Sequence, residues 1–299
     1  MLKLNTLVTA KALSECISNF PRKIKVLDAT WFLPSYGKKG IEVYKEGHIP
    51  GAAFFDIDEC STRSEYEHML PSESQFADYV GNLGIDNDTS VVVYNAHPDF
   101  ALFSAPRVWW TFHVFGHRDV SILSGGLRSW KDAGFPVATG VESHTRKVFN
   151  AKLNKDLIKS FEDVAENITS QKFQLIDARS AGRFHGTDPE PRKDCRPGHI
   201  PGSRSIPFPK ILCSYNGPDG QVVNHGAVKS PDELKQVFTE AGVDLDKPLT
   251  ASCGSGVTAC CLVLASFLCG KTDTCVYDGA WLEWYKRSTP EQREESPSD

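Results

Sequence analysis

Residues 248–268, Pro248-Leu-Thr-Ala-Ser-Cys253-Gly-Ser-Gly-Val-Thr258-Ala-Cys-Cys-Leu-Val-Leu-Ala-Ser-Phe-Leu268, carry the clearest structural signal in the chain. A short apolar run ends at Cys253, a loop with two glycines follows, and an apolar helical stretch begins near Val257. This order predicts a strand, a tight turn and a helix, with the thiol placed where free backbone N–H groups and the positive end of the helix dipole converge. Gly254 and Gly256 allow the positive φ angles that fold several N–H groups around one anion.

The cysteines of this stretch divide into two kinds. Flanking glycines serve a buried cysteine poorly, so we interpret Cys253 as a nucleophile, with a small buried hydrophobe as the alternative. For Cys260, Cys261 and Cys269, on the apolar stretch itself, we expect the buried and inert role. The backbone around Cys253, from Gly254 through Gly256, Val257 and Thr258, is then a cradle for a sulfur anion.

Two other motifs compete for the same loop. Gly254-Ser-Gly256-Val-Thr-Ala259 matches the dinucleotide pattern G-x-G-x-x-A, but only 40 residues follow Ala259, too few for the remaining strands of a nucleotide-binding sheet. A cysteine phosphatase loop needs an arginine six positions after the nucleophile to clamp phosphate, and that position is Ala259. Chemistry excludes the phosphatase, and topology disfavours the dinucleotide site.

The composition excludes several classes of function. The 299 residues suffice for about two domains. No apolar run approaches the ~18–20 residues of a membrane span, and the start lacks a signal-peptide core. A net charge of −5 with interspersed signs offers no footprint for nucleic acid or anionic lipid. Nine cysteines without any C-x-x-C pair predict reduced thiols, no zinc site and a cytoplasmic location.

The chain also repeats itself. Val26-Leu-Asp28-Ala recurs as Leu175-Ile-Asp177-Ala, and Gly47-His-Ile-Pro-Gly51 recurs as Gly198-His-Ile-Pro-Gly202. A period of about 150 residues indicates a duplicated domain and not a solenoid of short units. Strand-like runs (25–28, 90–94 and 120–123) alternate with helix-like stretches (72–83 and 231–241), which predicts parallel sheets.

We therefore expect an α/β protein of two tandem domains, each a parallel sheet covered by helices on both faces. The expected boundaries are residues 1–138 for the first domain, 139–160 for a linker, 161–288 for a catalytic domain and 289–299 for a disordered tail. Parallel sheets place their sites at the carboxyl ends of strands, and Cys253 lies at one such end.

Duplication supplies an internal control. His48 and His199 occupy the same repeated turn, so we expect both to shape the turn and neither to be catalytic. Asp28 and Asp177 are architectural by the same argument. Aligning 91–94 with 249–252 places Asn95 opposite Cys253, so the first half keeps the fold without the nucleophile. We infer one active half, one supporting half and a site at their interface.

The tandem halves, the two Gly-His-Ile-Pro-Gly turns and the loop 253–258 resemble the two-domain sulfurtransferases of the rhodanese superfamily over about residues 5–287. The resemblance implies a covalent persulfide on Cys253 and no other cofactor. Members that use thiosulfate carry basic residues after the cysteine, whereas Gly254 and Ser255 resemble the branch that uses 3-mercaptopyruvate. Segments 53–58, 104–110 and 182–192 support this closer match.

The resemblance also assigns the remaining site residues. Arg183 and Arg192 would bind the donor's carboxylate through their planar forks, with a solvated surface pair as the alternative. Arg179, after Asp177 in the repeated turn, is expected to be structural. Ser255 would relay a proton, oriented by His68 and Asp58 from the first half. The alternative for His68 is a helix-capping or surface histidine.

The implied reaction moves the sulfur of 3-mercaptopyruvate through Cys253 to thioredoxin, small thiols or cyanide, releasing pyruvate and, with thiols, hydrogen sulfide. Two alternatives stay open: a thiosulfate:cyanide sulfurtransferase, and a rhodanese-fold regulatory module without turnover. The expected protein is a monomer or weak homodimer without metal, nucleic-acid or membrane partners. The sequence leaves open whether part of the protein is mitochondrial in addition to the expected cytoplasmic location.

Overall fold

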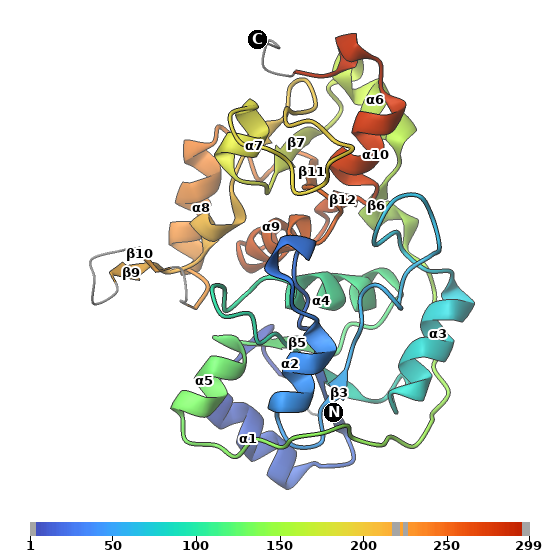
Figure 1. Cartoon of the computed structure of the whole chain (residues 1–299), viewed down its shortest axis with the longest axis vertical. Helices are drawn as coiled ribbons and strands as arrows, with labels where there is room; N and C mark the ends of the chain where they lie inside the picture. The colour runs from blue at the N-terminus through green and yellow to red at the C-terminus, as the bar shows by residue number, and fades with distance from the viewer. Residues whose placement is uncertain (1–3, 217–221, 224–226, 295–299) are drawn as a thin grey trace. The chain divides into compact units, whose positions relative to one another are not determined.

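The computed structural model describes residues 4–216, 222–223 and 227–294, which form two compact units (Figure 1). The first unit contains the described residues of Met1–Thr62, Leu70–Asn154 and Leu212–Val228. The second contains those of Arg63–Met69, Lys155–Ile211 and Lys229–Asp299. Each unit therefore includes one short segment from the other half of the sequence.

The first unit is built on a five-stranded parallel sheet in the order β1-β5-β4-β2-β3. Its helices cover both faces, with α1 and α5 side by side on one and α3 and α4 on the other. The strands are β1 (Leu7–Val8), β2 (Ile24–Asp28), β3 (Ala53–Phe54), β4 (Ser90–Tyr94) and β5 (Val120–Leu123). The helices are α1 (Ala10–Asn19), α2 (Gly40–Glu46), α3 (Glu73–Asn82), α4 (Ala105–Val114) and α5 (Gly126–Asp132).

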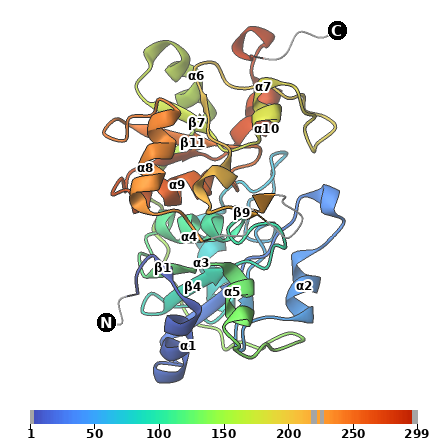
Figure 2. The ribbon, with the colours of Figure 1, turned by 90° about the vertical axis from the view of Figure 1, so that its left-hand side faces the viewer.

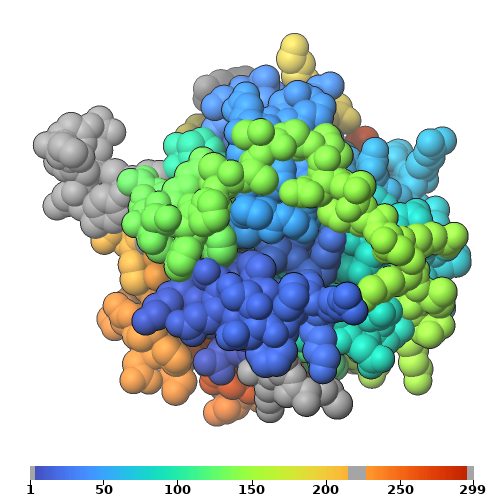
Figure 3. Space-filling model, turned by 90° about the horizontal axis from the view of Figure 1, so that it is seen from below, coloured from blue at the N-terminus to red at the C-terminus, as the bar shows by residue number. Residues whose placement is uncertain are grey.

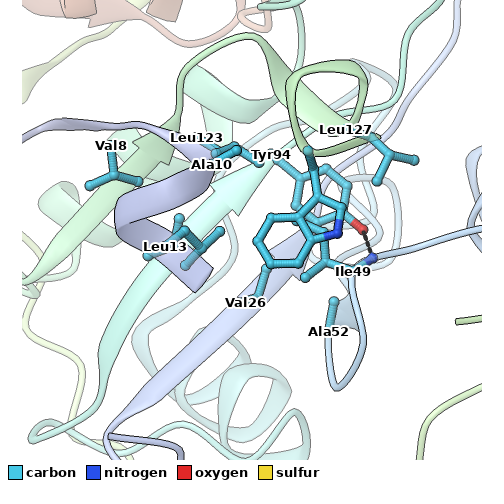
Figure 4. Packing of buried hydrophobic residues seen from close by; sticks show 11 residues of the cluster. Val8, Ala10, Leu13, Val26, Ile49, Ala52, Tyr94, Leu123 and Leu127 are labelled. Atoms are coloured by element: carbon cyan, nitrogen blue, oxygen red, sulfur yellow. Dashed lines mark hydrogen bonds between the residues drawn. The ribbon is translucent and has the colours of Figure 1, made fainter. Parts of the chain in front are cut away.

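The apolar core under α1 and α5 shows why the first sheet holds together. Alternate residues of β4, Val92 and Tyr94, face this layer and are fully buried. Trp130 of α5 belongs to the same cluster. Figure 4 shows Tyr94 and Leu127 within it. Tyr94 keeps its hydroxyl satisfied there by accepting the Ile49 N–H at 3.2 Å. Burial of such aromatic and aliphatic surface is the main stabilising contribution to the unit.

The second unit repeats the first. Its sheet has the order β6-β12-β11-β7-β8, again all parallel, which is the first order strand for strand. Helices α6 and α10 share one face, and α8 and α9 lie side by side on the other (Figure 2). The strands are β6 (Ile158–Lys159), β7 (Gln174–Asp177), β8 (Arg204–Ser205), β11 (Leu249–Ser252) and β12 (Cys275–Tyr277). The helices are α6 (Phe161–Ser170), α7 (Ala181–His185), α8 (Pro231–Glu240), α9 (Ala259–Leu268) and α10 (Ala280–Arg287).

These findings confirm the predicted fold class. The strand signals at 90–94 and 120–123 coincide with β4 and β5, and the helix signals coincide with α3 and α8. Ser72 and Ser230 begin those two helices as capping boxes, in which the serine hydroxyl accepts an N–H of the first turn. A short antiparallel pair, β9 (Tyr215–Asn216) and β10 (Val222–Val223), belongs to the first unit.

Two expected boundaries differ in detail. Residues 139–154 are not a free linker, because Gly140 and Lys147 donate backbone hydrogen bonds to Lys45 and Gly81, and Phe149 is buried. Figure 3 shows this segment in yellow-green along the surface of the first unit. The expected disordered tail begins with a 3-10 helix, Pro290–Gln292, whose Gln292 carbonyl accepts the Trp284 indole N–H at 3.0 Å. Residues 295–299 lie outside the described part of the chain.

Within the described residues, no helix is both long and apolar enough to cross a membrane. None of the nine cysteines, all of which lie in the described part of the chain, forms a disulfide. His113 and His117, which have the spacing of a metal pair, are both buried, and burial lowers the pKa of His113 to about 4. The described residues contain no group of three or more histidine, cysteine or acidic side chains placed to hold a metal ion.

Candidate active site

The loop from Cys253 to Thr258 joins the end of β11 to the start of α9, as the sequence predicts. Its carbonyl groups are used by neighbouring helices: Trp281 and Leu282 of α10 donate to the carbonyls of Cys253 and Gly254 at 2.9 and 3.1 Å. Cys261 likewise donates to the Thr258 carbonyl. Among the described residues, the N–H groups of Gly254, Ser255, Val257 and Thr258 form no backbone hydrogen bond. The loop therefore keeps its donors, not its acceptors, available for a ligand.

Cys253, Cys260 and Cys261 are all buried, and their place on the loop or on α9 distinguishes them. Cys253 is 2% exposed at the end of its strand. Cys260 and Cys261 are completely buried on α9, and burial raises the pKa of Cys261 well above its usual range. Both are the buried hydrophobes that the sequence predicts. Cys269, predicted to be buried as well, is only half-buried, because α9 ends one residue before it.

Two arginines approach this loop from α7 and the segment after it. The Arg183 Nε and Nη2 atoms donate to the two oxygens of Glu190 at 3.0 and 2.5 Å. Glu190 is nearly inaccessible and also accepts from Arg179 at 2.8 Å. Arg179 is fully buried, pairs with Asp177 and lies over the Trp281 ring, so its role is structural, as expected.

Gly254 brings both expected substrate-binding arginines to the nucleophile. A Cβ atom at this position would lie 2.8 Å from Arg183 Nη2 and 3.7 Å from Arg192 Nη1. Their side chains are only 17% and 10% exposed, so the alternative of a solvated surface pair is wrong. A side chain at position 254 would force Arg183 to shift, whereas Arg192 would remain at an ordinary contact distance.

Ser255 lies between a histidine and an arginine. Its Oγ is 3.0 Å from His68 Nδ1 and 3.4 Å from Arg192 Nη2. His68 is 3% exposed, so the alternative of a surface histidine is wrong. Its φ of 64° lies in the left-handed region, a strained conformation that is common at functional sites. Although it precedes the second half in sequence, the segment Arg63–Met69 belongs to the second unit.

The structure thus brings Cys253, Ser255, His68, Arg183 and Arg192 together within the second unit. Asp58, predicted to orient His68, belongs to the first unit, is exposed and accepts a hydrogen bond from the Trp31 indole at 3.2 Å. Its assigned role stays a prediction.

Sequence reasoning missed two acidic residues that hold the arginines. Glu190 fixes Arg183, and Glu67 accepts from Arg192 Nε at 3.0 Å and from Nη2. Glu190 carried a usable signal, because it stands between two prolines that restrict its backbone. No sequence pattern around Glu67 indicates its role, because its partner Arg192 lies 125 positions away.

The repeated turns behave as the internal control predicts. His48 and His199 each place Nδ1 within 2.9 Å of a carbonyl, that of Tyr44 or Phe184, and stack on the same partner's ring. These contacts fix the turn between helix and strand. Both histidines are architectural.

Known proteins agree with this architecture. The sequence profile of the rhodanese-like domain matches residues 22–133 and 160–287. The chain belongs to the rhodanese family.

Relatives extend over nearly the full length. The chain is 50% identical to 3-mercaptopyruvate sulfurtransferase of Mus musculus over 289 residues, covering 95% of this chain and 93% of the relative. It is 49% identical to thiosulfate sulfurtransferase of Rattus norvegicus over 291 residues, covering 96% and 94%. The crystal structure of SseA from Escherichia coli, described as a 3-mercaptopyruvate sulfotransferase, has a TM-score of 0.81 at 36% identity and covers 93% of this chain and 99% of its own. These relatives confirm the predicted class of two-domain sulfurtransferase, while the two nearly equal identities leave the donor to be decided by the site.

Proposed function

We propose that the chain takes sulfur from 3-mercaptopyruvate as a persulfide on Cys253, releases pyruvate and passes the sulfur to a thiol. The observation that carries this proposal is the convergence of Arg183 and Arg192 on Gly254, next to Cys253. A 2-keto acid needs a carboxylate-binding site at the reacting atom, and two arginines are the side chains best suited to build it.

The transfer step follows from the arrangement of these groups. The Cys253 thiolate attacks the donor's sulfur, the carbon–sulfur bond breaks, and its electron pair passes to carbon as the enolate of pyruvate. The proton of the donor's thiol is returned to that carbon, which leaves a persulfide anion on Cys253. Ser255 and His68, 3.0 Å apart, are placed to move this proton. The N–H groups of the loop then stabilise the persulfide.

The donor preference follows from what the loop lacks. Thiosulfate is a dianion, and the loop offers it no cation of its own, because Gly254 has no side chain and Ser255 is neutral. A basic residue at position 254 would have to displace Arg183, which Glu190 holds by two hydrogen bonds. The thiosulfate sulfurtransferase relatives make this donor the second candidate.

For the second half of the cycle, we propose a protein or small thiol as acceptor, with thioredoxin as the protein acceptor, in a cytoplasmic protein that is a monomer or weak homodimer. The acceptor's thiolate attacks the outer sulfur and restores Cys253. A second thiol on the acceptor then expels hydrogen sulfide and leaves a disulfide.

The deciding experiment gives the purified protein 3-mercaptopyruvate or thiosulfate, each with reduced thioredoxin or cyanide, and measures pyruvate and transferred sulfur. We expect 3-mercaptopyruvate to show a kcat/KM at least about tenfold higher than thiosulfate, since one charge contact shifts specificity by roughly 1–3 kcal/mol. A preference for thiosulfate would refute the proposed donor, and no turnover of either would favour the non-catalytic module.

A further inference from the structure

We propose that Glu67 is a displaceable counter-ion, which occupies the Arg192 fork until the donor's carboxylate takes its place and which sets the preference for monoanionic donors. This inference rests on the proposed function and names a residue that determines its specificity.

The two arginines at the loop are held by carboxylates of different kinds. Glu190, which holds Arg183, is 2% exposed and is shared with the buried Arg179. Glu67, which holds Arg192, has a side chain that is 44% exposed and pairs with that arginine. Glu67 regains water when the pair separates, whereas the Arg192 side chain is only 10% exposed and then needs another anion. Arg183 is therefore the fixed member of the pair, and Arg192 is the member whose partner can be exchanged.

The contacts of Glu67 are those that a donor carboxylate would make. One of its oxygens accepts from both Nε and Nη2 of Arg192, which are the two donors on one side of the guanidinium fork. The same Nη2 lies 3.4 Å from Ser255 Oγ. Exchange at Arg192 therefore takes place next to the Ser255–His68 hydrogen bond, where the donor's proton has to move.

Charge explains why this exchange favours a monoanion. The cluster contains three cations, Arg179, Arg183 and Arg192, and three carboxylates, Asp177, Glu190 and Glu67. A donor with one negative charge replaces Glu67 at the fork without changing the charge there. A dianion adds a surplus negative charge, and the displaced Glu67 next to it opposes binding further.

The test compares Glu67→Gln with Glu65→Gln, which removes the same charge two residues away. In Glu67→Gln, we expect the Michaelis constant of the mercaptopyruvate donor to fall about threefold to tenfold, with a smaller change in kcat, since an exposed carboxylate competes only modestly for the fork. The kcat/KM for thiosulfate should rise by a larger factor, and Glu65→Gln should change neither donor. If Glu67 merely held Arg192 in place, its loss would raise the Michaelis constant, which is the opposite sign.

A second measurement does not depend on turnover. Calorimetric titration of the intact protein with pyruvate and with thiosulfate should show tighter binding of both to Glu67→Gln than to the parent, and unchanged binding to Glu65→Gln. Failure of the donor assignment would leave this gain in anion binding intact, so the two failures are distinguishable. Glu67→Asp, which keeps the charge on a shorter side chain, should bind pyruvate with intermediate affinity. Equal or weaker anion binding by Glu67→Gln would overturn the proposal.

Discussion

The loop after β4 and the loop after β11 begin at equivalent positions of the two units and use their backbone in opposite ways. In the first, the Asn95 side chain accepts from the N–H groups of Phe103 and Ala105, and Ala96 donates to the Thr30 hydroxyl. In the second, Cys253 is followed by four N–H groups that form no backbone hydrogen bond within the described chain. Both lead residues are 2% exposed.

The difference lies in which backbone donors of the two loops are already bonded. Asn95 and Thr30 supply side-chain oxygens that satisfy donors of the first loop, so these donors are not left for a ligand. In the part of the chain that the structure describes, no side-chain oxygen accepts from the four N–H groups of the second loop, which leaves them available to an anion. If only the second unit transfers sulfur, as we propose, the first unit is inactive because donors of its loop are already bonded, and not only because it has Asn95 in place of a thiol.

The largest expected effect is the loss of the nucleophile. Cys253→Ser should abolish sulfur transfer while the unfolding midpoint changes little, because the hydroxyl cannot hold a persulfide. Mass spectrometry of the donor-treated parent should find about 32 Da, one sulfur atom, added at Cys253. Cys213→Ser, at an exposed cysteine, serves as the matched control. Added sulfur on Cys260 or Cys261 instead would contradict the assignment.

The reciprocal change places a cysteine in the first loop and tests whether a thiol alone makes a loop active. Asn95→Cys should not create a second persulfide, because the N–H groups of Ala96 and Asp99 stay bonded to the side chains of Thr30 and His97. The unfolding free energy should fall by about 1–3 kcal/mol, since buried N–H groups lose their acceptor. Detection of a persulfide at position 95 would show that the thiol alone makes an active loop.

The next effect concerns the two arginines that approach the second loop. Arg183→Lys and Arg192→Lys should each lower kcat/KM for the mercaptopyruvate donor by about tenfold to a hundredfold, because lysine keeps the charge and loses the planar fork. Steady-state kinetics with pyruvate detection measures this change. Arg146→Lys, at an exposed ion pair, is the control. Full activity with either lysine would mean that charge alone binds the donor.

The repeated aspartates should respond differently to pH. Burial raises the pKa of Asp28 to about 6, and Thr30 is its neutral partner, whereas Asp177 pairs with the buried Arg179. Because the folded pKa of Asp28 lies above the unfolded value of about 3.9, its contribution to stability falls as pH rises between about 4 and 6. Asp28→Asn should remove that loss, which amounts to roughly 3 kcal/mol.

Asp177→Asn should instead destabilise the protein by about 3 kcal/mol at neutral pH, since it leaves a buried guanidinium short of a partner. Urea unfolding of both variants at pH 4 and pH 7 measures the contrast. Equal responses would show that the two turns are held in the same way.

The smallest effect concerns the residue that begins α5 and α10. Gly126 and Ala280 are equivalent and have φ angles of 58° and 52°. A Cβ at Gly126 would lie 2.5 Å from the Asn95 carbonyl, so Gly126→Ala should cost about 2 kcal/mol of stability. Ala280→Gly should change stability by less than about 1 kcal/mol. Thermal unfolding of the two variants measures both changes in stability. An unchanged melting temperature for Gly126→Ala would contradict the argument for strain.

The sequence predicted the features that local patterns and duplication control. Short apolar runs between helix-like stretches located β4 and β5, and serine caps located α3 and α8. The repeat predicted that His48 and His199 shape their turns, and their contacts agree with this. Cys253 and its glycines were recognisable because their chemistry depends on neighbours in sequence. These features need no knowledge of long-range contacts.

The partners of the site could not be predicted in the same way. Glu67 lies beside Arg192 only because residues 63–69 join the second unit, and no local pattern encodes that contact. The placement of residues 290–294 had the same cause, since Glu294 exchanges two backbone hydrogen bonds with His199, 95 positions earlier. Long-range side-chain pairing was the part that sequence periodicity could not supply.

The second unit includes residues 63–69 and the first includes the described residues of 212–228, which has a consequence for synthesis. The first unit includes residues that the ribosome adds only after β8 has been made, so it cannot be completed as soon as its own half of the chain emerges. Contacts over such sequence separations raise contact order and slow folding. We therefore expect the first unit to finish folding only after the chain has been extended past residue 228, and not during the synthesis of its own half.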